Sequence, residues 1–405
     1  MKKILLIIFL VVLAFIGYYY WQNLRGASPA FTNPSQNIVE MFNNPQNEPL
    51  LPGQNQTEFP LSIPDGFTLS IFAKDLEKPR VLQLDPTETI VVSDMESGKI
   101  ISLPGNKVVT SGFNQPHGFL FDNCSKNICT LYVSEVTALW KYDYSTQTKM
   151  ASNKQKVISL PTGGNHFTRY LLKDPNNPNR LLISIGSTCD VCVENNLMNG
   201  SIQSFDLTMK EFKPYATGVR NSVFLTTRPG TTEVWGTEMG RDFLGDELPP
   251  DEINILKEGE NYGWPICYGA NIHDTQFDKT LYKIKAGLTV CEALEKVPSH
   301  IDLPAHSAPL GLTFVPSDSD WPKEYWGNLL VAYHGSWNRT EPTGYKIVRI
   351  ILDESGNKVS EQDFISGWLD GNSSIGRPVD LLATEKGELY ISDDKAGVVY
   401  LLKKI

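Results

Sequence analysis

Three histidines and two arginines stand at similar places in a repeated pattern of this 405-residue sequence. Each comes at the start of, or just before, an apolar, strand-like segment; the five are His117, His166, Arg220, His306 and Arg377. A neutral imidazole can accept a proton near neutral pH, and an arginine can pair with a carboxylate or stabilise a developing oxyanion. If the fold brings these positions together, the sequence predicts a site for proton transfer beside an anionic or carbonyl-bearing ligand.

The strand-like segments themselves follow one pattern, which occurs six times. In each copy an apolar strand leads through a turn rich in Asp, Pro, Gly or Asn into a second strand that ends in small or polar residues. The copies cover residues 81–94, 117–135, 169–187, 223–238, 310–334 and 379–394. A further strand-like run follows each copy, at 99–103, 138–144, 201–207, 251–256, 346–352 and 398–402. Six small antiparallel sheets arranged radially form a six-bladed β-propeller, so we expect an all-β domain over residues 61–405.

The propeller fold would bring the five polar residues close together at one end of its channel. In this fold the loops that lead into the innermost strands meet at one end of the central channel. Residues from five different blades would then face the same small volume. A long insertion between about residues 258 and 305 would lie on one face and shape the site. The alternative is that each residue only bonds to its own turn.

The first 21 residues form a separate segment. Two lysines precede a run of about eighteen almost wholly apolar or aromatic residues, which is long enough for a signal sequence or a membrane-spanning helix. No clear small-residue cleavage site follows, which favours an uncleaved anchor over a cleaved signal. The lysines place the N-terminus in the cytoplasm and everything after Trp21 outside it. Residues 22–60 are rich in Asn, Gln and Pro and are predicted to be a flexible linker.

Six cysteines fall into three local pairs, Cys124 with Cys129, Cys189 with Cys192, and Cys267 with Cys291. Close pairs of this kind are typical of disulfides formed in an oxidising compartment. A zinc site at Cys189 and Cys192 is the alternative, but no second ligand pair lies near it in the sequence. The cysteines therefore agree with an extracytoplasmic location, in a periplasm or at a cell surface.

Several functional classes are excluded by composition and motifs. A net charge of -10 and the lack of a basic stripe exclude nucleic-acid binding. No glycine-rich fingerprint follows a strand and opens a helix, which argues against a nicotinamide cofactor. The "GSW" and "GST" segments also lack the flanking residues of a serine hydrolase elbow.

A set of motifs resembles the pyrroloquinoline quinone (PQQ)-dependent sugar dehydrogenases, in particular the aldose and sorbosone dehydrogenase-like branch. The resemblance runs in order over residues 61–405. Its motifs are "GGNH" (163–166), "GVRNS" (218–222), "DEINILKEGENYGWP" (251–265), "HSAPLGLTF" (306–314), "YWGNLLVAYHGSWNR" (325–339) and "GRPVDLL" (376–382). It implies an oxidoreductase that binds PQQ with Ca²⁺ at the propeller mouth. Such an enzyme oxidises the anomeric hydroxyl of a sugar to a lactone and passes electrons to an external quinone or cytochrome.

The resemblance also implies roles for individual residues. His166 would be the general base, and Arg220 and Asn221 would lie against the quinone oxygens, with Arg220 also stabilising the charge that develops there. The backbone carbonyls of Gly240 and Arg241 would hold the calcium ion. The remaining cofactor contacts would come from Arg377, His117, His334 and Arg339.

The sequence departs from the family pattern at four places. A second arginine two residues after Arg377 is replaced by Val379, and a lysine expected near Gly335 is absent. The carboxylate that orients the base falls at Ser187, although Asp190 is close by. A glutamine expected near the substrate is replaced around His117. Two other functions stay open: a propeller that binds a sugar, glycan or protein without turnover, and a calcium-dependent lactonase.

Overall fold

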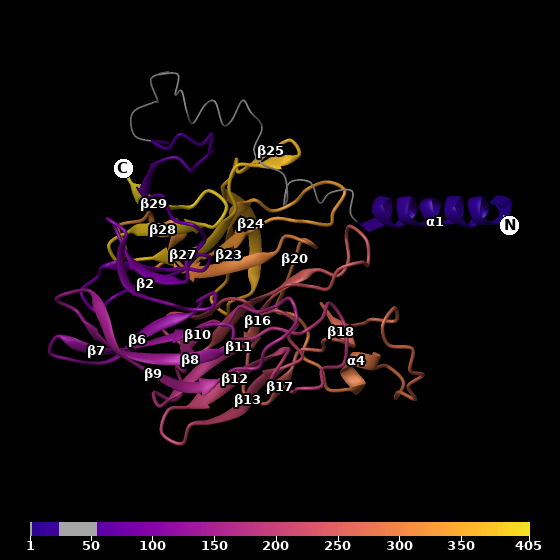
Figure 1. The fold of residues 1–405 in the computed structure, drawn as a ribbon, viewed down its shortest axis with the longest axis horizontal. Helices are drawn as coiled ribbons and strands as arrows, with labels where there is room; N and C mark the ends of the chain where they lie inside the picture. Colours follow the sequence, from indigo (N-terminus) through magenta and orange to yellow (C-terminus); the bar gives the residue numbers. More distant parts are fainter. Residues whose placement is uncertain (1, 24–54) are drawn as a thin grey trace.

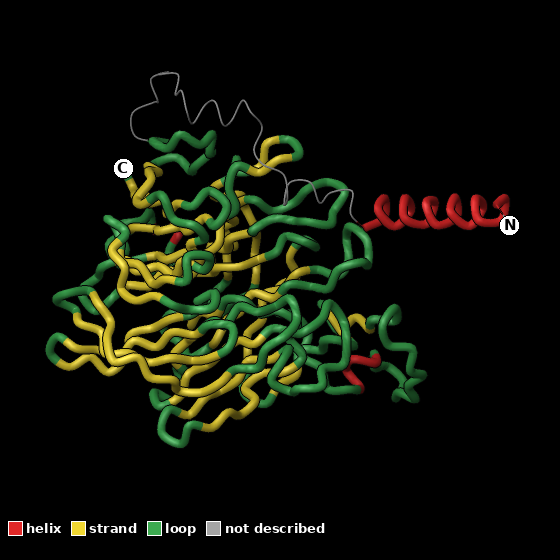
Figure 2. Tube along the Cα trace, in the orientation of Figure 1, coloured by secondary structure: helices red, strands yellow, loops and turns green. Residues whose placement is uncertain are grey.

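The computed structural model describes residues 2–23 and 55–405. Six antiparallel sheets stand around a common axis, so that the β-propeller and its all-β class are confirmed (Figure 1). Long strands and loops make up nearly all of the propeller, and its helical residues are confined to very short segments (Figure 2). The predicted repeats correspond to the two innermost strands of each blade.

The blades are numbered here in chain order from their innermost strands. Blade 1 contains β2 (Pro79–Leu84), β3 (Ile90–Asp94), β4 (Lys99–Ser102) and β5 (Lys107–Ser111). Blade 2 contains β6 (Phe119–Ser125), β7 (Ile128–Ser134), β8 (Ala138–Ser145) and β9 (Met150–Ser159). Blade 3 contains β10 (Leu171–Lys173), β11 (Arg180–Ile185), β12 (Ser201–Asp206) and β13 (Glu211–Thr217). Blade 4 contains β14 (Leu225–Thr227), β15 (Val234–Glu238), β16 (Asp251–Leu256) and β20 (Ile301–Leu303). Blade 5 contains β21 (Pro309–Phe314), β22 (Leu329–Tyr333), β23 (Lys346–Leu352) and β24 (Lys358–Ile365).

Blade 6 closes the ring with strands from both ends of the propeller. It contains β27 (Pro378–Ala383), β28 (Glu388–Asp393), β29 (Val398–Lys404) and, from the N-terminal side, β1 (Phe67–Ala73). The outermost pair runs antiparallel from Phe67↔Lys404 to Ala73↔Val399, and Phe67 and Leu69 are fully buried. These side chains pack in the apolar core that blades 5 and 6 share. Their transfer out of water is favourable, so their burial holds β1 in blade 6. The sequence repeats did not reveal this fourth strand.

The predicted linker is corrected at its end. Residues 24–54 lie outside the described part of the chain, but packing against the propeller begins before the predicted boundary at residue 61. The Asn55 amide donates to the carbonyl oxygens of Phe59 and Leu61, and both of those side chains are buried. The backbone of Ser62 bonds to that of Ser366. Apolar side chains inside a polar stretch anchor it to the blade surface.

The segment between β16 and β20 is the predicted insertion. It contains β17 (Glu260–Asn261), which pairs in parallel with β13, the two-stranded ribbon of β18 (Cys267–Tyr268) and β19 (Ile272–His273), and the short helix α4 (Val290–Ala293). Thr289 caps α4 through a reciprocal capping box with Glu292. Elsewhere the propeller carries a short 3₁₀ helix (Lys323–Tyr325) and the ribbon of β25 (Leu369–Asp370) and β26 (Ser373–Ser374).

All six cysteines form the three predicted disulfides, Cys124–Cys129, Cys189–Cys192 and Cys267–Cys291. The zinc alternative at Cys189 and Cys192 is therefore wrong, because a disulfide leaves no thiolate to bind a metal. The third disulfide ties α4 to the β18–β19 ribbon and so holds the insertion together.

Helix α1 (Lys2–Asn23) lies outside the propeller. Its 18-residue segment from Ile4 to Trp21 has a mean hydropathy of 2.4, and none of its residues is buried. It is the one helix in the described part of the chain that is long and apolar enough to cross a membrane, and this fits either an anchor or a signal sequence.

Candidate active site

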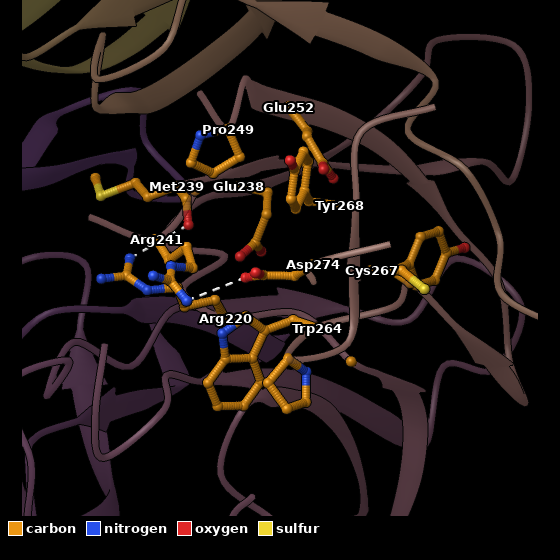
Figure 3. Close-up of a pocket in the computed structure, with 14 residues that line it drawn as sticks. Arg220, Glu238, Met239, Arg241, Pro249, Glu252, Trp264, Cys267, Tyr268 and Asp274 are labelled. Atoms are coloured by element: carbon orange, nitrogen blue, oxygen red, sulfur yellow. Dashed lines mark hydrogen bonds and ion pairs between the residues drawn. The ribbon is translucent and has the colours of Figure 1, made fainter. Parts of the chain in front are cut away.

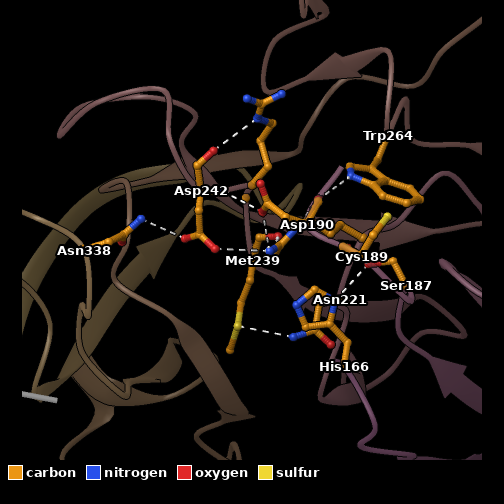
Figure 4. A network of polar contacts seen from close by, with 12 residues as sticks. His166, Ser187, Cys189, Asp190, Asn221, Met239, Asp242, Trp264 and Asn338 are labelled. Atoms are coloured by element: carbon orange, nitrogen blue, oxygen red, sulfur yellow. Dashed lines mark hydrogen bonds and ion pairs between the residues drawn. The ribbon is translucent and has the colours of Figure 1, made fainter. Parts of the chain in front are cut away.

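The loop between β9 and β10 carries His166, and the structure determines which ring nitrogen holds the proton (Figure 4). His166 Nδ1 lies 2.8 Å from Ser187 Oγ. The Ser187 hydroxyl donates its own proton to the Cys189 carbonyl over 2.7 Å. Because that hydroxyl has one proton, Nδ1 of His166 must be the donor and Ser187 Oγ the acceptor. Nε2 of His166 is left with its lone pair, which is the form a general base requires.

The environment of His166 keeps the imidazole neutral. Burial and the nearby Arg220 guanidinium lower its pKa to about 3. At neutral pH the ring can therefore accept a proton at Nε2. The group that meets Nδ1 is Ser187, at the position where the family resemblance places a carboxylate. Asp190 bonds to Arg220 instead.

Arg169 holds the loop that carries His166, and the sequence analysis did not identify it as part of the site. Its guanidinium Nη1 donates to the His166 carbonyl over 3.0 Å, and Nη2 donates to the Pro161 carbonyl over 2.9 Å. The side chain is buried and bonds to both ends of the loop. Only its place as the first residue of the third repeat could have drawn attention to it.

Arg220 is held at the mouth by backbone and carboxylate oxygens. Its Nη2 lies 2.7 Å from Asp190 Oδ1, its Nε donates to the Asp190 carbonyl over 2.8 Å, and its Nη1 donates to the Met239 carbonyl over 3.3 Å. Asp242 Oδ2 lies 3.5 Å from the same Nη2. Asp190, which the sequence placed near the base, therefore orients the arginine instead.

Asp242 joins the loops of two neighbouring blades. Its Oδ1 accepts hydrogen bonds from Trp337 Nε1 at 3.2 Å and Asn338 Nδ2 at 2.9 Å, on the loop that follows β22. Burial is the main cause that raises the pKa of Asp242 to about 6, with Arg220 opposing it and Asp190 adding to it. The aspartate thus connects Arg220 of one loop with the aromatic and amide groups of another.

Asn221 lies beside the base because Gly186 leaves room for it. A Cβ atom at Gly186 would lie 2.5 Å from Cβ of His166 and 2.9 Å from Oδ1 of Asn221, so no other residue fits without displacing them. The Asn221 N–H donates to Glu238 Oε1 over 2.7 Å. His166, Arg220 and Asn221 are therefore brought together in the structure.

A small pocket next to Arg220 is lined by Gly240 and Arg241 (Figure 3). The Gly240 N–H donates to Asp251, and the Arg241 side chain pairs with Asp274 at 3.1 Å. Glu238 also lines the pocket, and its buried Oε2 has no hydrogen-bond partner in the described residues. Carboxylate oxygens of Glu238 and Asp274, a kind of ligand that calcium prefers, line the pocket together with the Arg220 and Arg241 guanidinium groups.

Arg377 and His334 form the other side of the mouth. Arg377 donates from Nε to the His334 carbonyl over 2.9 Å and from Nη2 to the Gly335 carbonyl over 2.6 Å. Nε2 of His334 lies 2.8 Å from Oδ1 of Asp394. Burial, followed by the Arg377 charge, lowers the pKa of His334 to about 4.

Three of the predicted residues lie apart from the base. His117 is buried, its ring faces Tyr170 and Phe224, and neither ring nitrogen meets a partner with hydrogen-bond geometry in the described part. Nε2 of His306 lies 2.8 Å from the Gly245 carbonyl. Arg339 pairs with Glu247 at 2.6 Å. His306 and Arg339 therefore brace the loop that follows β15.

Buried carboxyl groups predict how the stability of the protein depends on pH. Burial raises the pKa of Glu238 to about 8 and those of Asp251, Glu252 and Asp380 to about 7. In the unfolded chain such groups titrate near 4, so at pH 6.5–8.5 the folded state holds more protons than the unfolded state. Raising the pH through this window removes that stabilisation, and the melting temperature is expected to fall. Calorimetry from pH 6.5 to 8.5 tests this, and Asp380→Asn should make the decline shallower; a melting temperature that rises would contradict it.

Comparison with known proteins gives related chains along the whole propeller. A protein of uncharacterised function from Borreliella burgdorferi is 31% identical, and the match covers 84% of this chain and 90% of that protein. The pyrroloquinoline quinone-dependent pyranose dehydrogenase of Coprinopsis cinerea is 23% identical over 87% of this chain but over 56% of its own length. The calcium structure of the Trichoderma reesei family AA12 enzyme shares the fold, with a TM-score of 0.70, 22% identity, and coverage of 87% and 100% of the two chains.

A family model extends over the predicted propeller without interruption. The TrAA12-like model matches residues 61–405, which are the same residues in which the sequence motifs and the six repeats occur. The resemblance to quinone-dependent sugar dehydrogenases is confirmed by these relatives. On the evidence of its propeller and of this match, the chain belongs to the TrAA12-like family.

Proposed function

We propose that this protein is a quinoprotein sugar oxidoreductase that oxidises the anomeric hydroxyl of an aldose or related sugar to a lactone. The observation that carries the proposal is the proton-free Nε2 of His166, which lies in the same site as Arg220 and Asn221. The pyranose dehydrogenase and sugar dehydrogenase names of the curated relatives support the substrate class and PQQ as the cofactor.

The residues at the mouth fit an anionic quinone. Arg220, Asn221, Arg377 and His334 would hold PQQ, and the carbonyls of Gly240 and Arg241 would hold Ca²⁺. His117 packs against aromatic rings and Arg339 pairs with Glu247, so these two are not assigned to the cofactor. Arg377 supports this fit, because it donates to backbone carbonyls and forms no ion pair with a carboxylate in the described residues. When bound, PQQ supplies the acceptor for the hydride that leaves the sugar carbon.

His166 would take the hydroxyl proton at Nε2. Ser187 keeps Nδ1 protonated throughout, so the ring cannot turn its other nitrogen to the substrate. Arg220 disfavours the imidazolium in the structure described here, and a carboxylate-bearing ligand between the two would raise the pKa of His166 toward neutrality. Binding of the ligand and the pKa of His166 would thus be coupled through their charges.

The location and partners follow from the rest of the chain. We infer that the propeller lies outside the cytoplasm, because its cysteines are paired and an apolar segment precedes it. The N-terminal helix would tether it to the membrane. There an external quinone or cytochrome could remove the electrons.

The test is reconstitution of the purified protein. PQQ and CaCl₂ are added, aldoses and pyranoses are supplied one at a time, and reduction of an artificial dye is followed. Dye reduction that needs both PQQ and a sugar is the expected result. If a broad sugar panel gives no reduction and PQQ does not bind, a propeller that binds sugars, glycans or proteins without turnover is the better explanation.

Removing Arg377 should weaken cofactor binding. The Arg377→Ala variant loses a charged donor, and hydrogen bonds to charged groups contribute about 1.5–3 kcal/mol, so we expect the PQQ dissociation constant to rise about 10- to 100-fold. At saturating PQQ, kcat should change little, because Arg377 neither donates nor accepts the proton that is transferred. Equilibrium dialysis and steady-state kinetics measure both values. An unchanged dissociation constant would remove Arg377 from the cofactor site.

A further inference from the structure

Arg80 is a further buried arginine close to the mouth, and no motif of the sequence analysis included it. It lies in β2, the innermost strand of blade 1, and its side chain is 7% exposed. Nη1 pairs with Asp394 Oδ2 at 2.7 Å. Nε is buried and has no hydrogen-bond partner in the described residues. An unpaired buried donor of a charged group is costly unless a ligand or water satisfies it.

Arg80 occupies in blade 1 the position that Val379 occupies in blade 6. The innermost strands of both blades begin with a proline that pairs with an aspartate, Pro79↔Asp94 and Pro378↔Asp393. Two residues later, the backbone N–H of Val81 donates to Ser93 Oγ and that of Asp380 donates to Ser392 Oγ, each over 3.0 Å. The residue between these two markers is Arg80 in one blade and Val379 in its neighbour.

Arg80 shares its carboxylate partner with His334 on the other side of the mouth. Asp394 is shared, because its Oδ1 meets His334 Nε2 at 2.8 Å while its Oδ2 meets Arg80. Arg377 donates to the carbonyl of the same His334. The charge of Arg80 is also among the causes that lower the pKa values of His117 and His334, after burial. Asp394 is the carboxylate that pairs directly with Arg80, and the Arg377 guanidinium bonds to backbone carbonyls nearby.

We propose that Arg80 binds a carboxylate of the quinone cofactor together with Arg377, and so replaces from blade 1 the arginine that is absent at Val379 of blade 6. This inference rests on the proposed function. Asp394 would orient the Arg80 guanidinium from behind, and the free Nε of Arg80 marks capacity for one more acceptor. Two charged donors from adjacent blades would hold the ligand in one orientation.

Equilibrium dialysis of PQQ against the full chain, with Ca²⁺ present, tests the proposal. Arg80→Met keeps the length of the side chain and removes its charge, and we expect the PQQ dissociation constant to rise about 10- to 100-fold. Arg80→Lys should recover part of the loss. The melting temperature of each variant without PQQ shows whether it is folded. If Arg80→Met binds PQQ as tightly as the wild type while Arg377→Ala does not, the inference is wrong and the proposed function stands; if the wild type binds no PQQ, the proposed function itself fails.

Two double variants separate direct binding from neutralisation of Asp394. In Arg80→Met/Asp394→Asn both charges are removed, and weak PQQ binding should persist if Arg80 contacts the cofactor. Recovery of wild-type affinity would mean that Arg80 only neutralises Asp394, which overturns the proposal. In Arg80→Val/Val379→Arg the arginine moves to blade 6, and we expect tighter PQQ binding than in Arg80→Val alone. If the folded Arg80→Val/Val379→Arg variant binds PQQ no more tightly than Arg80→Val, the two positions are not equivalent and the proposal is contradicted.

Discussion

Replacing His166 with glutamine is expected to lower kcat by about 10²- to 10⁴-fold, the range for loss of a positioned general base. Glutamine keeps the size and a polar group but cannot accept the hydroxyl proton near neutral pH. Cofactor binding and melting temperature should stay close to those of the wild type, because the Arg169 clamp holds the backbone of the loop and not the imidazole. Stopped-flow reduction of the PQQ-loaded protein by sugar measures the chemical step directly.

A matched control is His300→Gln, because Nε2 of His300 bonds to the Gly356 carbonyl on the neighbouring blade and touches no residue of the mouth. Its kcat should be unchanged. The Ser187→Ala variant should lose less than His166→Gln, since it removes only the acceptor that orients Nδ1. In the protein without PQQ, the pKa of His166 of about 3 predicts that an NMR titration of its ring shows no midpoint near pH 6.5. If His166→Gln keeps near-wild-type turnover at saturating PQQ, His166 is not the general base and its loop has only a structural role.

The Arg220→Met variant should show the second largest effect, with kcat lower by about 10²- to 10³-fold, the range for removing one donor to a developing oxyanion. The change also leaves Asp190 and Asp242 without their cationic partner, so we expect a lower melting temperature as well. The pKa of His166 should rise in this variant, because the guanidinium charge that helps to lower it is gone. NMR titration of the His166 ring and single-turnover kinetics report the two effects separately.

Arg228→Met is the matched control, because Arg228 pairs with Glu233 and the Glu354 carbonyl, away from the mouth. It should leave kcat unchanged. The triple variant Arg220→Met/Asp190→Asn/Asp242→Asn removes the unpaired charges together with the arginine. If it recovers the melting temperature but not kcat, the arginine acts in the reaction; recovery of both would show that Arg220 only neutralises the two aspartates.

The sequence predicted much of the fold and of the site because repetition is visible in one dimension. The six repeats located the two innermost strands of every blade, and the residues at the starts of the repeats included His166, Arg220 and Arg377. The cysteine pairs were predicted from spacing alone. The sequence did not predict the outer strand β1, which pairs with β29 although more than three hundred residues separate them. Nothing in the residue pattern of β1 indicates that β29 is the strand with which it pairs.

Two predictions made from local sequence differ from the structure: the end of the linker and the partner of Asp190. Residues 55–60 resembled a linker because they are polar, yet the buried Phe59 attaches them to blade 6. Asp190 lies near Ser187 in the sequence and was therefore considered with the base. In the fold its carboxylate turns to Arg220, since a charged guanidinium attracts it more strongly than a neutral imidazole does.

The sequence by itself determined the propeller, its disulfides and the residue types that can transfer a proton, because these depend on apolar periodicity, cysteine spacing and short motifs. Tertiary structure alone decided the tautomer of His166, the clamp by Arg169 and the position of Arg80 beside Asp394. Each of these contacts joins residues from different loops or blades. Their geometry depends on how the blades are rotated against each other, and hydrogen bonds depend on distances of a few tenths of an ångström that no sequence spacing expresses.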